Sequence, residues 1–220
     1  MDVLYYIGGG SRLNNDELRF SLRSLEKHCK DVDRVWIVGN KPAFLKNVEY
    51  LWVEDKYKWY TNAFMKTKAA IDAGISDEFL LMNDDFFMLD DFTAKDYPYY
   101  HRGDMPATPI NDYQKIIVNT RNFLASIDKP IKHYGVHCPI RIKGELYNKL
   151  ENYFFEPYSP RCLYGNLFCE GVRVPDCKSK DFQDKSPTKC FSSSDMSMRE
   201  TMNALAIMFP KPSKWENEDV

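Results

Sequence analysis

The sequence predicts an α/β fold in which a mainly parallel, Rossmann-like sheet is covered by helices on both faces. Short runs of β-branched, aromatic and leucine residues at 3–7, 34–38 and 79–82 indicate buried strands. Apolar residues at helical spacing over 15–30, and a segment rich in alanine, lysine and methionine at 61–73, indicate helices between these strands. Such alternation is typical of parallel sheets, whose two faces are both buried under helices.

The first strand and the first helix have recognisable boundaries. Residues 3–7 lead into three consecutive glycines, the pattern of a buried strand that ends in a tight loop. Asn14 is predicted to cap the helix at 15–30, and Glu17 follows it three residues later. The apolar residues that recur on one face of this helix are Leu18, Leu22, Leu25 and Cys29.

The later elements are less sharply defined. A further strand is expected at 48–53, and Gly74 should end the second helix. Beyond Phe92 the order weakens into an aromatic and proline-rich stretch that we expect to be loop, and residues 161–189 are too rich in turn residues and charges for assignment. The remaining helices are predicted at 143–153 and 196–208.

Composition narrows the class of protein. Thirty Lys and Arg residues against 32 Asp and Glu residues give a net charge of -2, so no global basic field would draw the chain to nucleic acid or to an anionic membrane. We find no apolar run long enough for a transmembrane segment and no signal-peptide pattern at the N-terminus, so we expect a soluble protein of the cytoplasm, or of the host cytoplasm if it is viral. Six cysteines in such a compartment are expected to be thiols.

The chain is predicted to form one domain over residues 1–220. Its length suits a single substantial core, and we find no internal repeat, low-complexity segment or linker that would divide it. We expect residues 1–92 to be a nucleotide- and metal-binding half, because they hold the strand and helix alternation. Residues 93–220 would then form the acceptor side.

The strongest candidate site is Asn83-Asp84-Asp85, directly after a buried strand. Ligands of open parallel sheets bind outside the carboxyl ends of the strands. Two adjacent carboxylates there raise each other's pKa unless a cation compensates, so Mg or Mn that bridges carboxylate and diphosphate oxygens is the expected occupant, with Asp85 as a direct ligand and Asp84 as a second ligand or a donor contact. A turn with solvated aspartates is the alternative interpretation.

A glycine-rich loop follows the first strand. Gly9 and Gly10 would let a nucleotide approach the backbone, and Ser11 and Arg12 could contact its phosphates. The loop lacks the Walker and the dinucleotide-binding fingerprints, so an ordinary turn is the alternative.

Two further residues are candidates for catalysis. His137 lies in an otherwise apolar context and could be a metal ligand or a general base near neutral pH, or a structural histidine. Asp195 follows three serines ahead of the last predicted helix, where it could cap that helix or face the active cleft.

The order of these motifs resembles the Stealth family, which includes capsular polysaccharide phosphotransferases and the lysosomal-enzyme N-acetylglucosamine-1-phosphotransferase. The opening 2–11 is similar to the family's first region. Residues 15–27, followed by 35–38 and 79–87, are similar to its second. His137-Cys138-Pro139 resembles the third region, whose histidine lies near the reaction centre. Residues 209–216, Phe-Pro-Lys-Pro-Ser-Lys-Trp-Glu, resemble the closing motif of the family.

The resemblance implies a compact GT-A-like fold that uses a nucleotide-sugar. It strengthens the metal assignment at Asp84 and Asp85. The usual Trp-Val-x-Gly-Ser-Asp of the first region is Tyr-Ile-Gly-Gly-Gly-Ser here, and Ser194-Asp195 stands where the family has Asn-Asp. These departures leave open whether a sugar or a sugar phosphate is transferred.

Three candidate functions are consistent with these features of the sequence. The leading hypothesis is a metal-dependent transferase that moves a sugar, or a sugar-1-phosphate, from a nucleotide-sugar to a hydroxyl acceptor, with a glycan favoured over nucleic acid. A viral-type enzyme that glycosylates a hydroxylated DNA base would need a phosphate track from scattered basic residues: Lys115, Arg121, Lys129, Lys132, Arg141 and Lys143. A non-catalytic sugar-binding module would use aromatic side chains for stacking: Trp52, Tyr57, Trp59, Tyr60 and Tyr97 to Tyr100.

Overall fold

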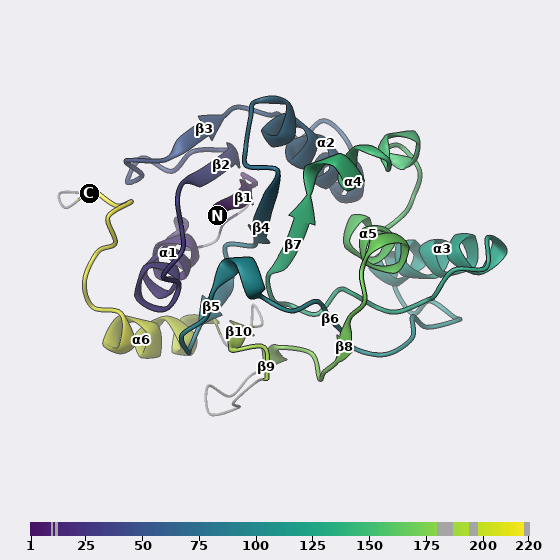
Figure 1. Ribbon diagram of the computed structural model, residues 1–220. Helices are drawn as coiled ribbons and strands as arrows, with labels where there is room; N and C mark the ends of the chain where they lie inside the picture. Colours follow the sequence, from purple (N-terminus) through teal and green to yellow (C-terminus); the bar gives the residue numbers. More distant parts are fainter. Residues whose placement is uncertain (10, 12, 180–186, 194–197, 218–220) are drawn as a thin grey trace.

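A five-stranded sheet forms the centre of the computed structural model, which describes residues 1–9, 11, 13–179, 187–193 and 198–217. The spatial order of its strands is β3-β2-β1-β4-β7 (Figure 1). The first four strands run parallel, and β7 pairs antiparallel with β4 at one edge. The predicted α/β fold with a mainly parallel sheet is confirmed. The strands of this sheet are β1 (Asp2–Ile7), β2 (Val35–Gly39), β3 (Glu49–Leu51), β4 (Glu78–Met82) and β7 (Ile140–Lys143).

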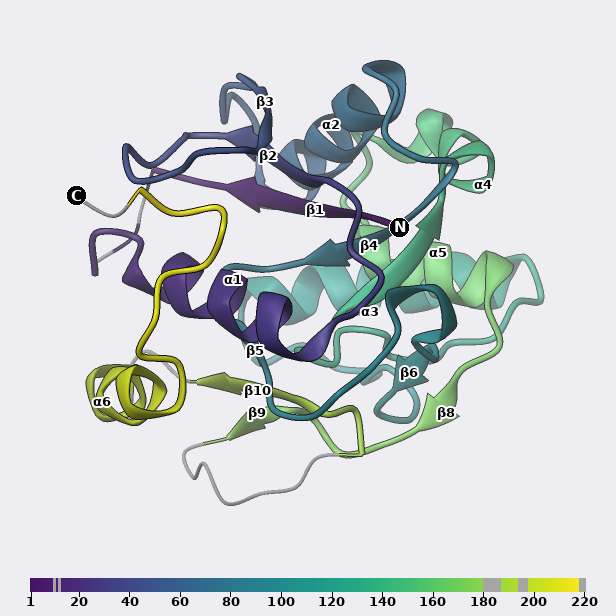
Figure 2. The same ribbon diagram turned by 60° about the vertical axis from the view of Figure 1, so that its left-hand side comes forward.

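Helices cover both faces of this sheet, as Figure 2 shows for α1 and α2. Alternate residues of β1 point to opposite faces because side chains alternate along a strand. Tyr5 packs with Leu22 of α1 in one buried cluster. Leu4 packs with Phe64 of α2 in a second cluster, to which the later helices also contribute. The helices are α1 (Asp16–His28), α2 (Trp59–Asp72), α3 (Asp112–Ser126), α4 (Gly144–Asn148), α5 (Pro160–Phe168) and α6 (Met198–Met208), with short 3₁₀ turns at Ala94–Asp96 and Glu151–Tyr153.

The first helix forms where the sequence predicts it, but its capping differs. Its predicted apolar face is buried, including Cys29 just after the helix. Asn14 is not the N-cap: Asn15 precedes the helix and makes no side-chain capping bond, and both asparagines have positive φ angles of 54° and 62°. The hydroxyl of Ser11 instead accepts a hydrogen bond from the backbone N–H of Asn15 at 2.8 Å. The left-handed backbone at both asparagines departs from the extended backbone that an N-cap residue normally has.

The second half of the chain differs most from the sequence prediction. Helices α3 and α5 lie in stretches without a predicted helix, and the helix predicted at 143–153 is α4 followed by a 3₁₀ turn, with strand β7 before it. Both missed helices carry local signals. The side chain of Asn111 caps α3 by accepting from Gln114 N at 2.8 Å, and Ser159 with Pro160 begins α5. Strand β7 is specified by its pairing with β4, which no local pattern reveals.

A smaller sheet brings residues 190–193, late in the chain, next to the turn that follows β4. Its strands, in the order β5-β10-β9, are Phe86–Met88, Cys190–Ser193 and Lys178–Ser179. Strand β10 runs antiparallel to β5 and places Ser192 opposite Phe86. Helix α6 covers this sheet through Leu205, which packs with Phe87. A parallel pair of two short strands, β6 (Tyr100–His101) and β8 (Val172–Arg173), replaces part of the predicted loop.

Two expectations from composition can be compared with the structure. All six cysteines are free, as predicted. Burial raises the pKa of Cys29 to about 12, so that thiol stays protonated. Within the described part of the chain, no helix has the length and apolar character needed to cross a bilayer.

The C-terminal segment is held to α1 by one buried carboxylate. Glu216 is inaccessible to solvent and accepts from Arg23 at 2.7 and 2.9 Å and from Ser213 N at 2.9 Å. Burial raises the pKa of Glu216, but these hydrogen bonds outweigh it and hold the pKa below its ordinary value. The closing motif therefore acts as a structural anchor.

Replacing this carboxylate should destabilise the fold. Glu216→Ala leaves the partly buried Arg23 guanidinium without its carboxylate partner and the Ser213 amide without its acceptor, so we expect a loss of roughly 3 kcal/mol in the free energy of unfolding. Because the folded-state pKa is depressed, the loss should be full at pH 7 and should shrink as the pH falls through that pKa. Urea denaturation at pH 7 and at pH 4 measures it.

A matched control is Glu54→Ala. Glu54 forms an exposed pair with Lys56, in which both side chains are about 60% accessible, and such pairs contribute about 0.5 kcal/mol. Equal losses for the two variants would refute the anchoring role of Glu216.

Candidate active site

A cleft of about 540 Å³ opens at the carboxyl ends of β1 and β4. Gly8, directly after β1, and Asn83, directly after β4, lie in its wall because the two parallel strands are neighbours in the sheet. Lys66 of α2 lines the same cleft. His137 and Arg161 reach it from the second half of the chain. Both predicted halves therefore contribute to one concave site.

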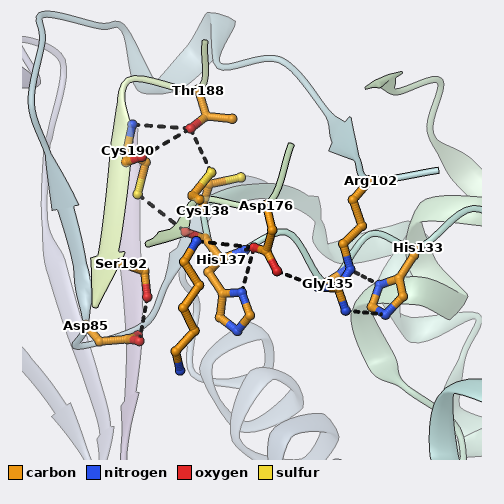
Figure 3. Close-up of polar contacts among 12 residues, drawn as sticks. Asp85, Arg102, His133, Gly135, His137, Cys138, Asp176, Thr188, Cys190 and Ser192 are labelled. Atoms are coloured by element: carbon orange, nitrogen blue, oxygen red, sulfur yellow. Dashed lines mark hydrogen bonds and ion pairs between the residues drawn. The ribbon is translucent and has the colours of Figure 1, made fainter. Parts of the chain in front are cut away.

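The turn after β4 carries the acidic residues. The Asp85 carboxylate accepts from the Ser192 hydroxyl at 2.8 Å (Figure 3), so β10 and β4 meet at this turn. Burial, the neighbouring Asp85 and Glu17 of α1 together raise the pKa of Asp84 to about 7. Glu17 is itself buried, and its Oε2 has no hydrogen-bond partner among the described residues. The turn thus holds more negative charge than its surroundings compensate.

The chemistry of this turn fits a hard divalent cation. Two adjacent carboxylates, one with a raised pKa, are stabilised in their charged forms when a cation approaches. Within the described residues, no group of three or more His, Cys, Asp or Glu side chains is arranged to hold a metal. Such a cation would therefore take its remaining ligands from a substrate or from water, which is the usual habit of Mg²⁺.

Of the described residues in the glycine loop, Gly8 lines the cleft, whereas Gly9 and Ser11 are not among its lining residues. A side chain at Gly9 would approach the Asn40 amide to 2.9 Å, so the loop lies close against the end of β2. Gly10 and Arg12 lie outside the described residues. The Ser11 hydroxyl accepts from the backbone amides of Leu13 and Asn15, which assigns it a part in the entry to α1.

His137 is held by an aspartate that the sequence did not reveal. Its Nδ1 lies 2.7 Å from Oδ1 of Asp176, and its backbone amide donates to the same oxygen at 3.2 Å (Figure 3). Burial raises the pKa of Asp176, but the hydrogen bond from His137 and the charge of Arg102 hold it well below its ordinary value. With Nδ1 bound in this way, Nε2 has no partner among the described residues. Nε2 is therefore the ring nitrogen of His137 that is left for a ligand or a proton.

A second layer of contacts fixes Asp176. Arg102 forms an ion pair with this carboxylate, and its other terminal nitrogen lies 2.8 Å from Nε2 of His133 (Figure 3). Burial and the charge of Arg102 lower the pKa of His133 to about 4, so this imidazole is neutral at pH 7. No local motif marks these residues, because Asp176 follows His137 by 39 positions within the stretch that the sequence left unassigned.

The structure brings together Gly8, Asn83 and His137 around the cleft, with Asp84 and Asp85 in the turn that begins at Asn83. Asp195 lies outside the described residues. Ser192, three positions earlier, bonds to Asp85, so the strand that leads toward Asp195 runs beside the acidic turn.

The aromatic and basic residues that the sequence suggested for sugar stacking and phosphate binding lie in different parts of the structure. Tyr57 and Trp59 line the cleft, where Trp59 stacks on Tyr113 of α3 with ring centres 5.5 Å apart. Tyr97 is buried in the core. Of the expected phosphate track, three members are paired with acids: Lys115 with Asp112, Lys132 with Asp104 and Arg141 with Glu78.

Comparison with known proteins identifies the fold. No protein-family model matches the chain, and no curated protein sequence matches it significantly. Among solved structures, the galactosyltransferase LgtC in complex with donor and acceptor sugar analogues matches with a TM-score of 0.54 at 12% identity, over 97% of this chain and 98% of that one. An active-site mutant of LgtC matches at 0.49, with 12% identity and coverages of 97% and 98%. The apo form of mouse xyloside xylosyltransferase 1 matches at 0.43, with 10% identity and coverages of 78% and 85%.

The likeness to the LgtC complex, at a TM-score of 0.54, establishes the fold alone. The chain has the mixed α/β architecture of GT-A-type glycosyltransferases, which the sequence predicted. Membership of the Stealth family stays a hypothesis, because no family model supports it.

The raised pKa of Asp84 predicts an unusual pH dependence of stability in the absence of metal. Its folded-state pKa of about 7 exceeds the ordinary 3.8. The folded protein therefore keeps a proton that the unfolded chain loses, and stability falls as the pH rises between these values. Asp84→Asn should raise the melting temperature at pH 8 and raise it much less at pH 4, measured with a chelator present.

Asp33→Asn is the control, because Asp33 is exposed and lies outside the cleft. A lower melting temperature for Asp84→Asn at pH 8, or an equal gain at both pH values, would contradict the buried, uncompensated charge.

Proposed function

We propose that the protein is a glycosyltransferase that moves a sugar from a nucleotide-sugar to a hydroxyl group of a glycan. The observation that carries this proposal is the cleft at the carboxyl ends of β1 and β4, which joins Gly8 and Asn83 to His137 in a GT-A-type fold. Its volume of about 540 Å³ suits a ligand of nucleotide-sugar size. The LgtC structure carries donor and acceptor sugar analogues, which is consistent with this use of the fold.

The donor would lie along the sheet edge. Gly9, Gly10, Ser11 and Arg12 would contact the nucleotide, and Asn83 would lie beside the diphosphate. Asp85 would hold Mg²⁺ or Mn²⁺, with Asp84 as second ligand or as a contact to the ribose. When bound, such a cation supplies charge neutralisation of the leaving diphosphate.

His137 would take the proton of the acceptor hydroxyl. Asp176 accepts from Nδ1 and stabilises the imidazolium that forms, so Nε2 is the atom that receives the proton. As its oxygen loses the proton, the acceptor attacks the anomeric carbon, and the bond from that carbon to the phosphate oxygen breaks. Asp195 is the alternative base, and His137 as a metal ligand is the alternative role.

The Stealth resemblance implies transfer of a sugar-1-phosphate as a second possible reaction. The nucleotide that is released distinguishes this reaction from transfer of a sugar. Sugar transfer releases a nucleoside diphosphate, whereas sugar-phosphate transfer releases a monophosphate. A screen of nucleotide-sugars by thermal shift with and without Mn²⁺ identifies the donor, because a ligand of the native state raises the melting temperature. Chromatography of the released nucleotide then decides between the two reactions.

Loss of the Asp85 carboxylate should abolish the effect of Mn²⁺ on donor binding. In Asp85→Ala we expect the Mn²⁺-dependent part of donor binding, measured by calorimetry, to disappear, because one carboxylate of the pair is gone. Asp90→Ala, at an exposed position five residues later, is the control and should bind like the parent. Unchanged Mn²⁺ dependence in Asp85→Ala would refute the metal assignment.

Removal of His137 should slow turnover more than it weakens binding. For a base we expect His137→Ala to lose roughly two to four powers of ten in turnover with little change in donor affinity. For a metal ligand, Mn²⁺-dependent donor binding should fall as well. Turnover, donor affinity and melting temperature are measured on the same variant.

Two further variants sharpen this experiment. Asp176→Asn should lower turnover and shift its pH profile, because His137 would lose the carboxylate that stabilises its charged form. His28→Ala removes a histidine whose ring bonds to Asp91 outside the cleft, and it should leave turnover unchanged. Full turnover of His137→Ala, or a loss explained entirely by unfolding, would exclude a catalytic role.

A further inference from the structure

Arg161 occupies a position in the cleft that no motif of the sequence marks. It is the second residue of α5, and its guanidinium lies 5.8 Å from the ring centre of Phe86, at the start of β5. One terminal nitrogen donates to the carbonyl oxygen of Cys138 at 2.5 Å. These contacts hold the charged group next to the turn that follows β4.

Arg161 lies near the acidic turn but has no direct counterion among the described residues. In the described part of the chain no carboxylate forms an ion pair with it, whereas Lys66 in the same cleft lies 2.7 Å from Asp55. Tyr6 and Cys138, whose pKa values the charge of Arg161 lowers, are neutral at pH 7, because burial raises both pKa values and Arg161 only partly offsets this. A half-buried cation without a counterion is costly unless a ligand supplies the negative charge.

The hydrogen bonding of Arg161 is also incomplete. Its Nε is buried and has no acceptor among the described residues. An anion that enters the cleft and offers oxygen atoms to this Nε would be bound favourably, because the buried donor then gains an acceptor. Because guanidinium presents several N–H groups in one plane, phosphate oxygens suit it well.

The surroundings of Arg161 favour a phosphate group as the anion that it binds. Ser159 and Pro160 place the beginning of α5 at the cleft, where the helix dipole adds to the positive potential of Arg161. Asn83 in the same cleft marks the carboxyl end of β4, where phosphates of nucleotide ligands lie in open parallel sheets.

We propose that Arg161 binds the diphosphate of the nucleotide-sugar donor and stabilises it as the leaving group; this inference rests on the proposed function. The acceptor oxygen forms a bond to the anomeric carbon, and the bond from that carbon to the β-phosphate oxygen breaks. The electron pair of the broken bond stays on the diphosphate oxygen. Arg161 stabilises the negative charge that this adds to the diphosphate. The acceptor proton leaves through the base.

The test compares nucleoside diphosphates with the corresponding monophosphates, by calorimetry with and without Mn²⁺. The parent protein should prefer the diphosphate of the nucleotide that its donor carries. In Arg161→Gln we expect diphosphate affinity to fall about 10- to 100-fold, the usual value of a charged hydrogen bond, while monophosphate affinity changes little. Arg161→Lys keeps the charge but not the planar fork and should lose less.

Matched controls separate this inference from the proposed function. Lys149→Gln removes an exposed positive charge at the end of α4 and should bind like the parent. If the parent binds nucleoside diphosphates and Arg161→Gln keeps its preference for them, the role of Arg161 is refuted and the proposed function stands. If the parent binds none of them, both are refuted. Should Arg161→Gln fail to fold, Arg161→Lys decides: undiminished diphosphate preference together with undiminished turnover overturns the proposal.

Discussion

The parallel pairing of β1 with β2 and β4 is the constraint on which the rest of the molecule depends. Val3 lies opposite Val35 on one side and Leu80 on the other, so the carboxyl ends of the three strands form a single edge. Parallel neighbours require crossover connections, and these are the helices that bury both faces. The loop after β1 and the turn after β4 therefore face one cleft, which the later helices close.

Charge is distributed unevenly around this cleft, and the imbalance is what suits it to a charged ligand. Asp84 is kept from ionising freely by burial and by its acidic neighbours, whereas Arg161 carries a charge without a carboxylate partner in the described residues. Each group lowers the stability of the free protein. A diphosphate with a divalent cation would compensate both, because it offers negative charge to one and positive charge to the other. Glu216, by contrast, is fully bonded and serves the fold.

The second half of the chain supplies the groups that orient the chemistry. Asp176 fixes the ring of His137, and Arg102 and His133 fix Asp176. These residues come from segments with little regular structure, where hydrogen bonds and ion pairs, rather than helix or strand geometry, determine the positions of side chains. An arrangement of this kind needs the whole tertiary structure to be in place.

The sequence by itself determined the class of fold, the first four strands of the sheet and the acidic turn at its edge, because hydrophobic periodicity and glycine placement act over a few neighbouring residues. It also marked His137. The edge strand β7, the Ser192 contact to Asp85 and the Asp176 contact to His137 were decided by tertiary structure, since each joins positions 39 or more residues apart. The predicted N-cap of α1 was wrong because Asn14 and Asn15 have left-handed backbone, with φ angles of 54° and 62°, which the short-range pattern of the sequence does not reveal.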